Sequence, residues 1–288
     1  MKTYLELFRI KEWVKNIIVF APLFFSTRLF DDHLILQTGI VFIAFCLISS
    51  AVYILNDLSD LSFDRQHPTK KDRPIASGKI SKQQALLVAL FLLLSSFALG
   101  MVLNWTVIWV LMAYLIINLF YSLWLKNIAI VDVFVISLGF ALRLLAGAKA
   151  TEIVLSDWII LLTFLLSVFL VLGKRRQDLL LIEKHGFTPC KSLSQYSVEY
   201  INLVLIMMAS VVTAIYVMYS ISPELRIRIG NDYFKLTSVW IILAFLRYFQ
   251  LTMVMKNFKS PISLFFEDLF LMGIVVLWML SCFFFIYI

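Results

Sequence analysis

The amino-acid sequence predicts an all-α integral membrane protein with about nine transmembrane helices. Its 288 residues are 62% hydrophobic and only 15% charged, and they include 26 phenylalanines. The mean hydropathy is +0.94, which is more apolar surface than a soluble domain of this length can bury. Apolar runs of about 20 residues recur and match the ~30 Å hydrocarbon core of a bilayer. We therefore expect a single polytopic membrane domain over residues 1–288.

The composition argues against several other classes of protein. The formal net charge is +7, but in a membrane protein Lys and Arg report orientation, so we expect no nucleic-acid partner. The three cysteines show none of the spacings of metal ligands. No cleavable signal peptide is predicted, because the charged N-terminus lacks a small-residue cleavage pattern.

The first half of the chain begins with a surface helix. Residues 2–16 alternate apolar and basic positions with helical period, which predicts an amphipathic helix on the membrane, with Trp13 at the interface. Lys15 then stands at the mouth of the first span, where headgroup contact and a substrate role are equal alternatives. Five spans are predicted at about 17–30, 36–55, 82–102, 105–125 and 128–148.

A polar loop over residues 56–82 interrupts these spans. Its His67-Pro68 and Arg73-Pro74 steps require extended backbone, so a shaped loop is expected rather than a longer helix. Ser81 and Gln84 form a capping-box pattern that begins the third span.

The second half of the chain has a sixth span at about 157–173, a polar stretch over 174–198, and spans at about 199–221, 236–255 and 264–288. Asp132 and Arg143 are eleven residues apart in the fifth span and share a helix face. A functional site and a structural ion pair both fit that placement.

The basic residues are distributed unequally between the two predicted sides. Of the 25 Lys and Arg residues, 18 lie on the side of the 56–82 and 174–198 loops and 5 on the other, and Arg143 and Arg247 lie within spans. By the positive-inside rule, both loops face the cytoplasm from the inner (plasma) membrane.

Residues 56–64, N-D-L-S-D-L-S-F-D, contain the most informative pattern. On a continuous helix Asn56, Asp57, Asp60 and Asp64 fall within an arc of ~100°, so three carboxylates and an amide share one face. Solvated charges at a helix end are the alternative, but acidic residues are unfavourable there and repel one another. Because Mg²⁺ would compensate them, we predict a magnesium site.

Three basic groups are expected at the same ends of the spans: Lys70, Lys71 and Arg73 in one loop, Lys126 in a second, and Lys174, Arg175 and Arg176 in a third. Carboxylates among so many cations suit a magnesium-bound phosphate or diphosphate. Attraction to anionic lipid, at ~1 kcal/mol per basic residue, is the alternative, but it leaves the aspartates unexplained.

The stretch N-D-x-x-D-x-x-x-D-R-x-H-P-T-K-x-x-R-P-I-A-x-G at residues 56–78 resembles the first aspartate-rich motif of UbiA-type membrane prenyltransferases. Trp13-Val14-Lys15-Asn16, Arg143-x-x-Ala146-Gly147 and Gly173-Lys174-Arg175 add a resemblance to the decaprenyl-phosphate phosphoribosyltransferase branch. The resemblance implies nine spans around a central cavity, with Mg²⁺ and a diphosphate at its cytoplasmic mouth.

The chain departs from the wider family at its second polar stretch. A second aspartate-rich motif is typical there, whereas this sequence offers a basic run followed by Asp178. A basic run suits a donor with an additional phosphate, such as 5-phosphoribosyl diphosphate. The resemblance then implies a polyprenyl monophosphate as acceptor, with pyrophosphate released.

In this interpretation Asp57, Asp60 and Asp64 are the catalytic residues and hold Mg²⁺, with Asn56 in support. Residues predicted to bind substrate phosphates are Lys70, Arg73, Lys174 and Arg175, with Lys15 and Lys126 as weaker candidates. Expected partners are 5-phosphoribosyl diphosphate, polyprenyl phosphate and membrane lipid, and a homo-oligomer is compatible with the sequence.

Two other functions remain open at this stage. Transfer of a prenyl group from prenyl diphosphate to an aromatic acceptor is disfavoured by the missing second aspartate motif. A non-enzymatic transporter or lipid-binding protein would use Asp132, Arg143 and Arg247 as a permeation path. That function would leave the acidic residues 56–64 without a role.

Overall fold

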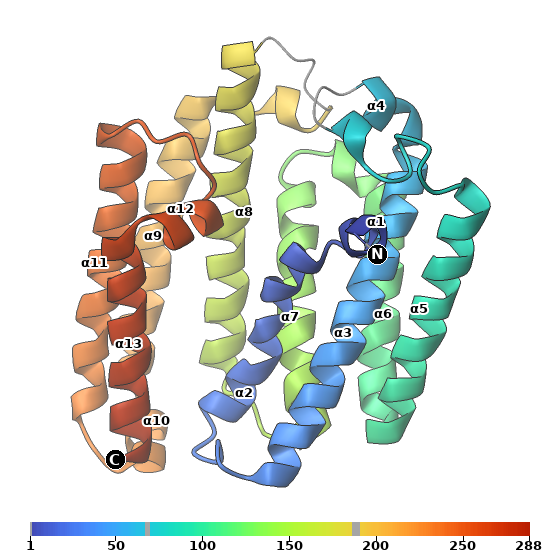
Figure 1. Ribbon diagram of the computed structural model, residues 1–288. Coiled ribbons are helices and arrows are strands. Elements are labelled where there is room, and N and C mark those ends of the chain that lie inside the picture. Colours follow the sequence, from blue (N-terminus) through green and yellow to red (C-terminus); the bar gives the residue numbers. More distant parts are fainter. Residues whose placement is uncertain (1, 67–69, 186–190) are drawn as a thin grey trace. The chain divides into compact units, whose positions relative to one another are not determined.

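The structure is a computed structural model that describes residues 2–66, 70–185 and 191–288, and throughout these ranges it is helical with no strand (Figure 1). Eight helical segments are long and apolar enough to cross a membrane. They are α3 (Asp32–Ser59), α5 (Lys82–Leu103), α6 (Trp105–Leu123), α7 (Val131–Thr151), α8 (Asp157–His185), α9 (Val198–Ser220), Tyr233–Val254 and α13 (Leu269–Tyr287). The predicted fold class, a multi-pass membrane protein of α-helices, is confirmed.

The first predicted span, 17–30, differs from these eight. Its residues form the end of a 3-10 helix, η1 (Ile10–Phe20), and a single turn, α2 (Ala21–Phe24). Arg9 lies near the C-terminal end of α3, where it contacts Asp57, and Asp31 caps the opposite end of α3. Because 28 helical residues extend about 42 Å, residues 9–31 traverse the same depth in the reverse direction. Counting this traverse, about nine crossings agree with the prediction.

The surface helix predicted over 2–16 is divided in two. Helix α1 (Lys2–Leu7) ends before Arg9, whose φ of 50° is left-handed and interrupts the helix. The contact between Arg9 and Asp57 holds this conformation in place.

Two compact units make up the chain, where the sequence predicted a single membrane domain. The first comprises Met1–Lys126 with Leu138–Leu155, and the second comprises Asn127–Ser137 with Ser156–Ile288. Helix α7 therefore contributes its first turns to the second unit and its remainder to the first.

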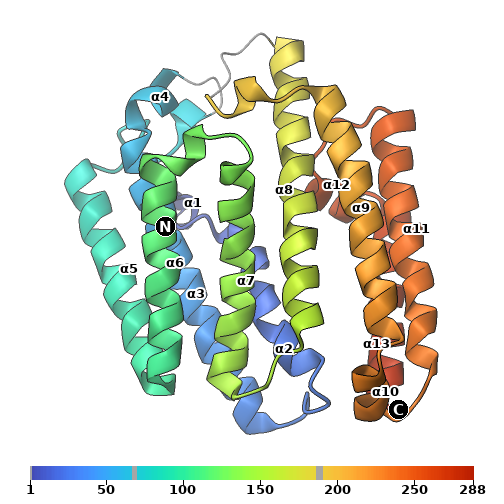
Figure 2. The same ribbon diagram turned by 180° about the vertical axis from the view of Figure 1, so that it is seen from behind.

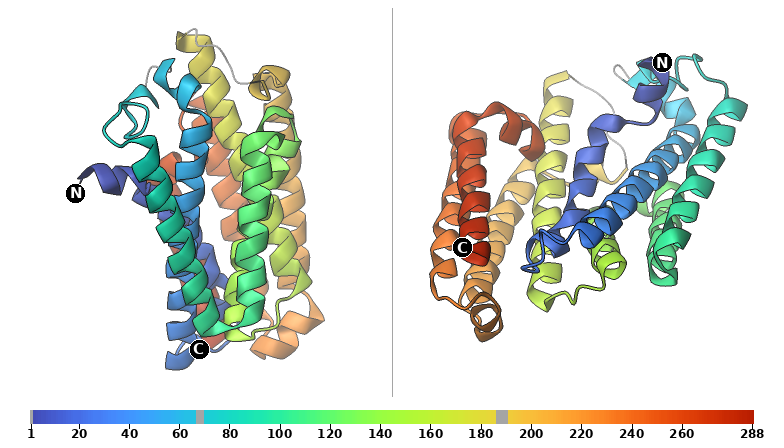
Figure 3. Two further views of the ribbon diagram at one scale, coloured as in Figure 1. Left: turned by 90° about the vertical axis from the view of Figure 1, so that its right-hand side faces the viewer. Right: turned by 60° about the horizontal axis from the view of Figure 1, so that its bottom comes forward.

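In the first unit α3 and α5 lie side by side, with η1 also against α3 (Figures 1 and 3). Phe45 of α3 is fully buried and meets Tyr114 of α6 edge-on, with ring centroids 5.3 Å apart. A Cβ on Gly147 of α7 would lie 2.0 Å from the carbonyl oxygen of Val19. Only glycine permits this approach of η1, as small residues do between membrane helices.

In the second unit α8 and α9 lie side by side, and α11 (Ser238–Phe249) lies against α13 (Figure 2). Phe169 of α8 packs edge-on against Phe245 and Tyr248, each at a centroid distance of 5.0 Å. A Cβ on Gly173 would lie 2.4 Å from Cγ of Pro261, the first residue of α12 (Pro261–Glu267). Gly173 therefore admits α12 against α8.

The polar stretch predicted over 174–198 is largely helical. Helix α8 continues from Asp157 to His185, about three turns beyond the predicted end at residue 173. No proline or glycine follows Gly173 until Gly186, and Leu179, Leu180 and Ile182 keep the sequence apolar, so nothing ends the helix earlier. In the other loop α4 (Leu61–Gln66) and a 3-10 turn (Lys70–Asp72) precede α5, and Ser81 with Gln84 forms the predicted capping box.

Candidate active site

The acidic motif lies where α3 ends. Helix α3 stops at Ser59, Asp60 is its C-cap, and Asp64 belongs to the next helix, α4. The single helix face predicted for Asn56, Asp57, Asp60 and Asp64 is therefore wrong. The physical reason is the one that made the cluster unusual, because carboxylates at a helix C-terminus oppose its dipole.

Asp57 and Asp64 are brought together by arginine. Nη1 of Arg73 lies 3.0 Å from Oδ1 of Asp57 and 2.6 Å from Oδ2 of Asp64, and Arg9 also contacts Oδ1 of Asp57. The two aspartates are 4% and 1% exposed. Buried carboxylates require compensating charge, and the two arginines supply it. Oδ1 of Asp64 is nevertheless buried with no hydrogen-bond partner in the described ranges.

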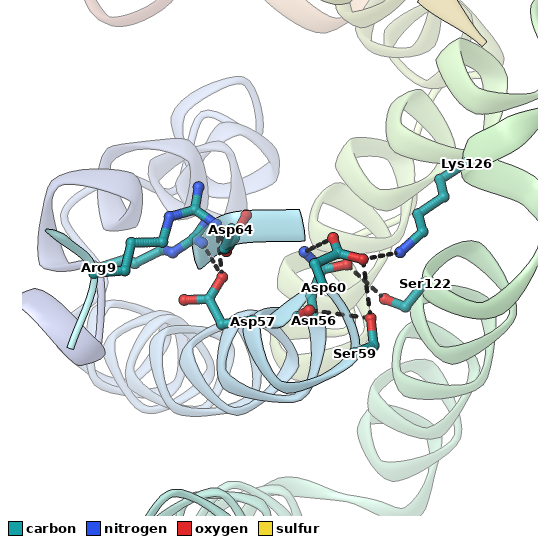
Figure 4. A network of polar contacts seen from close by, with 9 residues as sticks. Arg9, Asn56, Asp57, Ser59, Asp60, Asp64, Ser122 and Lys126 are labelled. Atoms are coloured by element: carbon teal, nitrogen blue, oxygen red, sulfur yellow. Dashed lines mark hydrogen bonds and ion pairs between the residues drawn. The ribbon is translucent and has the colours of Figure 1, made fainter. Parts of the chain in front are cut away.

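Asp60 belongs to a separate group on the other side of the end of α3 (Figure 4). It forms an ion pair with Lys126 and accepts hydrogen bonds from Asn56 at 3.3 Å and from Ser59 at 3.3 Å. Ser122 of α6 donates to Oδ1 of Asn56 at 3.1 Å. Lys126 therefore reaches the acidic motif as predicted, but at Asp60 and not at Asp57 or Asp64.

The remaining predicted residues of the first unit have other partners. Lys15 forms an ion pair with Glu12 within η1. The ammonium of Lys70 lies 5.3 Å from the centroid of the Phe63 ring. His67, Pro68 and Thr69 of the motif lie outside the described residues.

The basic run of the second unit points in three directions, because successive residues of a helix are ~100° apart. Lys174 is exposed. Arg175 lies 2.9 Å from Oδ2 of Asp132 and 3.7 Å from Asp178. Arg176 is buried and donates from Nε to Asn202 at 2.7 Å and from Nη2 to the carbonyl oxygen of Thr252 at 3.1 Å.

The predicted pairing of Asp132 with Arg143 is wrong. Arg143 is buried in the first unit and donates to Asn16 at 2.6 Å, to the carbonyl oxygen of Gly139 at 2.8 Å and to Tyr114 at 2.9 Å. Eleven residues separate Asp132 and Arg143 by about 16 Å along the helix axis, so a shared face does not bring them into contact. Arg247 is also paired, with Asp268 at 2.6 Å.

A divalent cation fits part of the predicted set. In the ranges that the structure describes, no three His, Cys, Asp or Glu side chains gather into a group that could hold a metal ion. Mg²⁺, however, commonly binds one or two carboxylates together with water and substrate phosphate. Asp57 and Asp64 converge on one positive charge, and Oδ1 of Asp64 has no hydrogen-bond partner there, so these two residues fit such a site.

Comparison with known proteins identifies the family. A model of the UbiA prenyltransferase family matches residues 17–180, which include the whole acidic motif. The chain belongs to the UbiA prenyltransferase family. A solved structure of a UbiA homologue from Archaeoglobus fulgidus, bound to GPP and Mg²⁺, matches 99% of both chains with a TM-score of 0.72 at 20% identity. The UbiA fold thus extends over nearly the entire protein.

Two curated UbiA relatives share more of the sequence. Decaprenyl-phosphate phosphoribosyltransferase from Mycobacterium tuberculosis is 34% identical over 244 residues, covering 83% of this chain and 80% of the relative. The protein of that name from Corynebacterium glutamicum is also 34% identical, covering 83% and 74%.

Several contacts of this UbiA site had no signal in the sequence. Arg9 lies 48 residues before its partner Asp57 and Ser122 lies 66 residues after Asn56, so local spacing reveals neither pair. Arg9 had been assigned only to the basic face of a surface helix.

Proposed function

We propose that this protein transfers 5-phosphoribose from 5-phosphoribosyl diphosphate to a polyprenyl monophosphate and releases pyrophosphate. The observation that carries this proposal is the pair of buried carboxylates, Asp57 and Asp64, converging on arginine at a motif shared with a named phosphoribosyltransferase. We further propose that this end of the first unit faces the cytoplasm from the inner membrane, where a water-soluble donor is available.

Asp57 and Asp64 would hold Mg²⁺, with Asp60 as a third ligand, as the sequence predicts. The bound cation would stabilise the charge that develops on the leaving diphosphate. Arg73 and Arg9 already place positive charge beside Asp57, so they suit donor phosphate oxygens at the same place. Lys126 and Asn56 fix the orientation of Asp60. Lys15 and Lys70 remain proposed contacts to substrate phosphates.

The acceptor needs little help from a protein base. A lipid monophosphate is already ionised, so its oxygen attacks C1 of the ribose directly. The bond from C1 to the diphosphate oxygen breaks, and pyrophosphate leaves with the bonding electrons. The side chains contribute positioning and electrostatic stabilisation.

Lys174 and Arg175 of the second unit are proposed to bind a phosphate of the donor that a prenyl diphosphate lacks. This role is suggested by charge and chemical type, because guanidinium and ammonium groups form strong charge-assisted bonds to phosphate. Arg176 is not included, since its donors are already bonded to Asn202 and Thr252.

The proposal is tested with purified protein in detergent, labelled 5-phosphoribosyl diphosphate, polyprenyl phosphate and Mg²⁺. We expect a labelled lipid product and release of pyrophosphate in equal amounts, with both lost in EDTA. A parallel reaction supplies prenyl diphosphate and 4-hydroxybenzoate. Prenylation of the benzoate, without any phosphoribosyl product in the first reaction, would overturn the proposal in favour of ordinary prenyl transfer.

A further inference from the structure

Asp132 in the second unit is a buried carboxylate that the proposed reaction does not use. It stands in the first turn of α7 with an exposed fraction of 0%. Its Oδ2 lies 2.9 Å from Nη2 of Arg175, and its Oδ1 accepts a hydrogen bond from the Tyr196 hydroxyl at 3.1 Å. A carboxylate is costly to bury, so its two partners identify what it stabilises.

Tyr196 connects this pair to a strained turn. Its hydroxyl oxygen accepts a hydrogen bond from the backbone N–H of Ile130 at 2.5 Å. Ile130 has a φ of 69°, a left-handed conformation that a β-branched residue rarely adopts. Burial raises the pKa of Tyr196 to about 12, so the hydroxyl keeps its proton and donates to Asp132. Strain of this kind persists only where surrounding contacts enforce it.

The two sides of the Arg175 guanidinium are held unequally. Asp132 lies 2.9 Å from Nη2, whereas Asp178, one turn further along α8, lies 3.7 Å from Nη1. The second distance is longer than a hydrogen bond, so a phosphate oxygen competes with Asp178 more easily than with Asp132. The Arg175 side chain is 15% exposed, and Lys174 beside it is exposed.

We propose that Asp132 and Tyr196 are positioning residues that orient Arg175 toward a phosphate group of the ribosyl donor. Asp132 fixes one side of a planar fork of donors, Tyr196 fixes Asp132, and the strained turn at Ile130 fixes Tyr196. The inference rests on the proposed function, because it assigns Arg175 to the donor of that reaction.

A purely structural ion pair is the competing explanation, and the second unit offers a matched control. Arg247 and Asp268 form another arginine–aspartate pair at 2.6 Å, between α11 and α13, away from the basic run in sequence. Asp132→Asn and Asp268→Asn each remove one carboxylate charge beside one guanidinium. A structural role predicts similar effects on stability and none on donor KM.

The experiment measures kcat, donor KM, acceptor KM and thermal unfolding for the full-length protein in detergent with Mg²⁺. For Asp132→Asn we expect donor KM to rise about 10- to 100-fold, in line with the loss of a well-oriented charge-assisted contact, with kcat and acceptor KM within about threefold of wild type. Asp132→Glu, which keeps the charge, should recover part of the donor affinity. Asp268→Asn should leave donor KM unchanged.

Two results would overturn the inference while leaving the proposed function intact. One is an unchanged donor KM in a folded Asp132→Asn protein. If that variant does not fold, Tyr196→Phe decides, because it removes one hydroxyl and should still raise donor KM about three- to tenfold; an unchanged KM there is the second overturning result. Failure of the wild-type protein to transfer phosphoribose would overturn the proposed function and this inference together.

Discussion

The end of α3 in the first unit and the basic run of α8 in the second respond to clustered charge in opposite ways. The three aspartates at the end of α3 collect arginine and lysine partners from distant segments, and the helix itself breaks at Asp60. The three cations of α8 remain on one unbroken helix and are separated by its turn. Charges at a helix end can thus be gathered, whereas consecutive charges within a helix are dispersed.

A second contrast concerns the two buried arginines, Arg143 and Arg176, one in each unit. Each donates Nε to an asparagine side chain and an Nη to a backbone carbonyl. Among the described residues neither has a carboxylate in salt-bridge range. Neutral acceptors are thus enough to hold a guanidinium between helices, so basic character alone does not identify a phosphate contact.

The largest effect is expected from Asp57→Asn at the gathered cluster. The variant keeps the shape of the side chain but removes half of the proposed pair of metal ligands, so turnover should fall by several kcal/mol, about 1000-fold or more. Arg9 and Arg73 also lose a charged acceptor, so some loss of thermal stability is expected.

Asp31→Asn is the matched control for that variant, because Asp31 pairs with Arg28 at the opposite end of the same helix. It should turn over at close to the wild-type rate in the same assay. An Asp57→Asn protein that retains more than a tenth of wild-type activity would show that the cluster is structural.

The next largest effect concerns the packing that sets the cluster in place. Gly147→Ala would put a Cβ 2.0 Å from the Val19 carbonyl oxygen, so η1 must move, and we expect about 3 kcal/mol or more of lost stability. Gly39→Ala is its control, because nothing lies within 4 Å of that position in α3 and alanine favours a helix by about 1 kcal/mol. Thermal unfolding in detergent compares them, and equal melting temperatures would contradict the close approach.

A smaller effect distinguishes the members of the dispersed run. Lys174→Ala should weaken the ribosyl donor by ~1.5–3 kcal/mol, roughly 10- to 150-fold, whereas loss of lipid attraction alone would cost ~1 kcal/mol and act on membrane association. Arg176→Gln should lower the melting temperature and leave donor KM unchanged, because Arg176 joins α8 to Asn202 and Thr252. Equal effects of both variants on donor KM would restore the continuous basic surface that the sequence predicted.

Much of the fold was predictable, because each span carries its own apolar run, and Ser81 with Gln84 marks the start of α5. The position of the acidic motif was predictable for the same local reasons. The division of its carboxylates was not, since it depends on Arg9, Arg73 and the break at Asp60. Gly173 was read as the end of a span, but it serves the approach of Pro261, a contact made 88 residues later in the chain.

The central claim is that the end of α3 binds the ribosyl donor through a divalent cation. Equilibrium binding of labelled 5-phosphoribosyl diphosphate, measured for wild type, Asp57→Asn and Asp31→Asn in Mg²⁺ and in EDTA, tests it without requiring turnover. We predict that EDTA weakens binding by at least about tenfold for wild type and Asp31→Asn, and that Asp57→Asn binds weakly in both conditions. Donor binding that is equally tight in EDTA, or unchanged in Asp57→Asn, would contradict the claim.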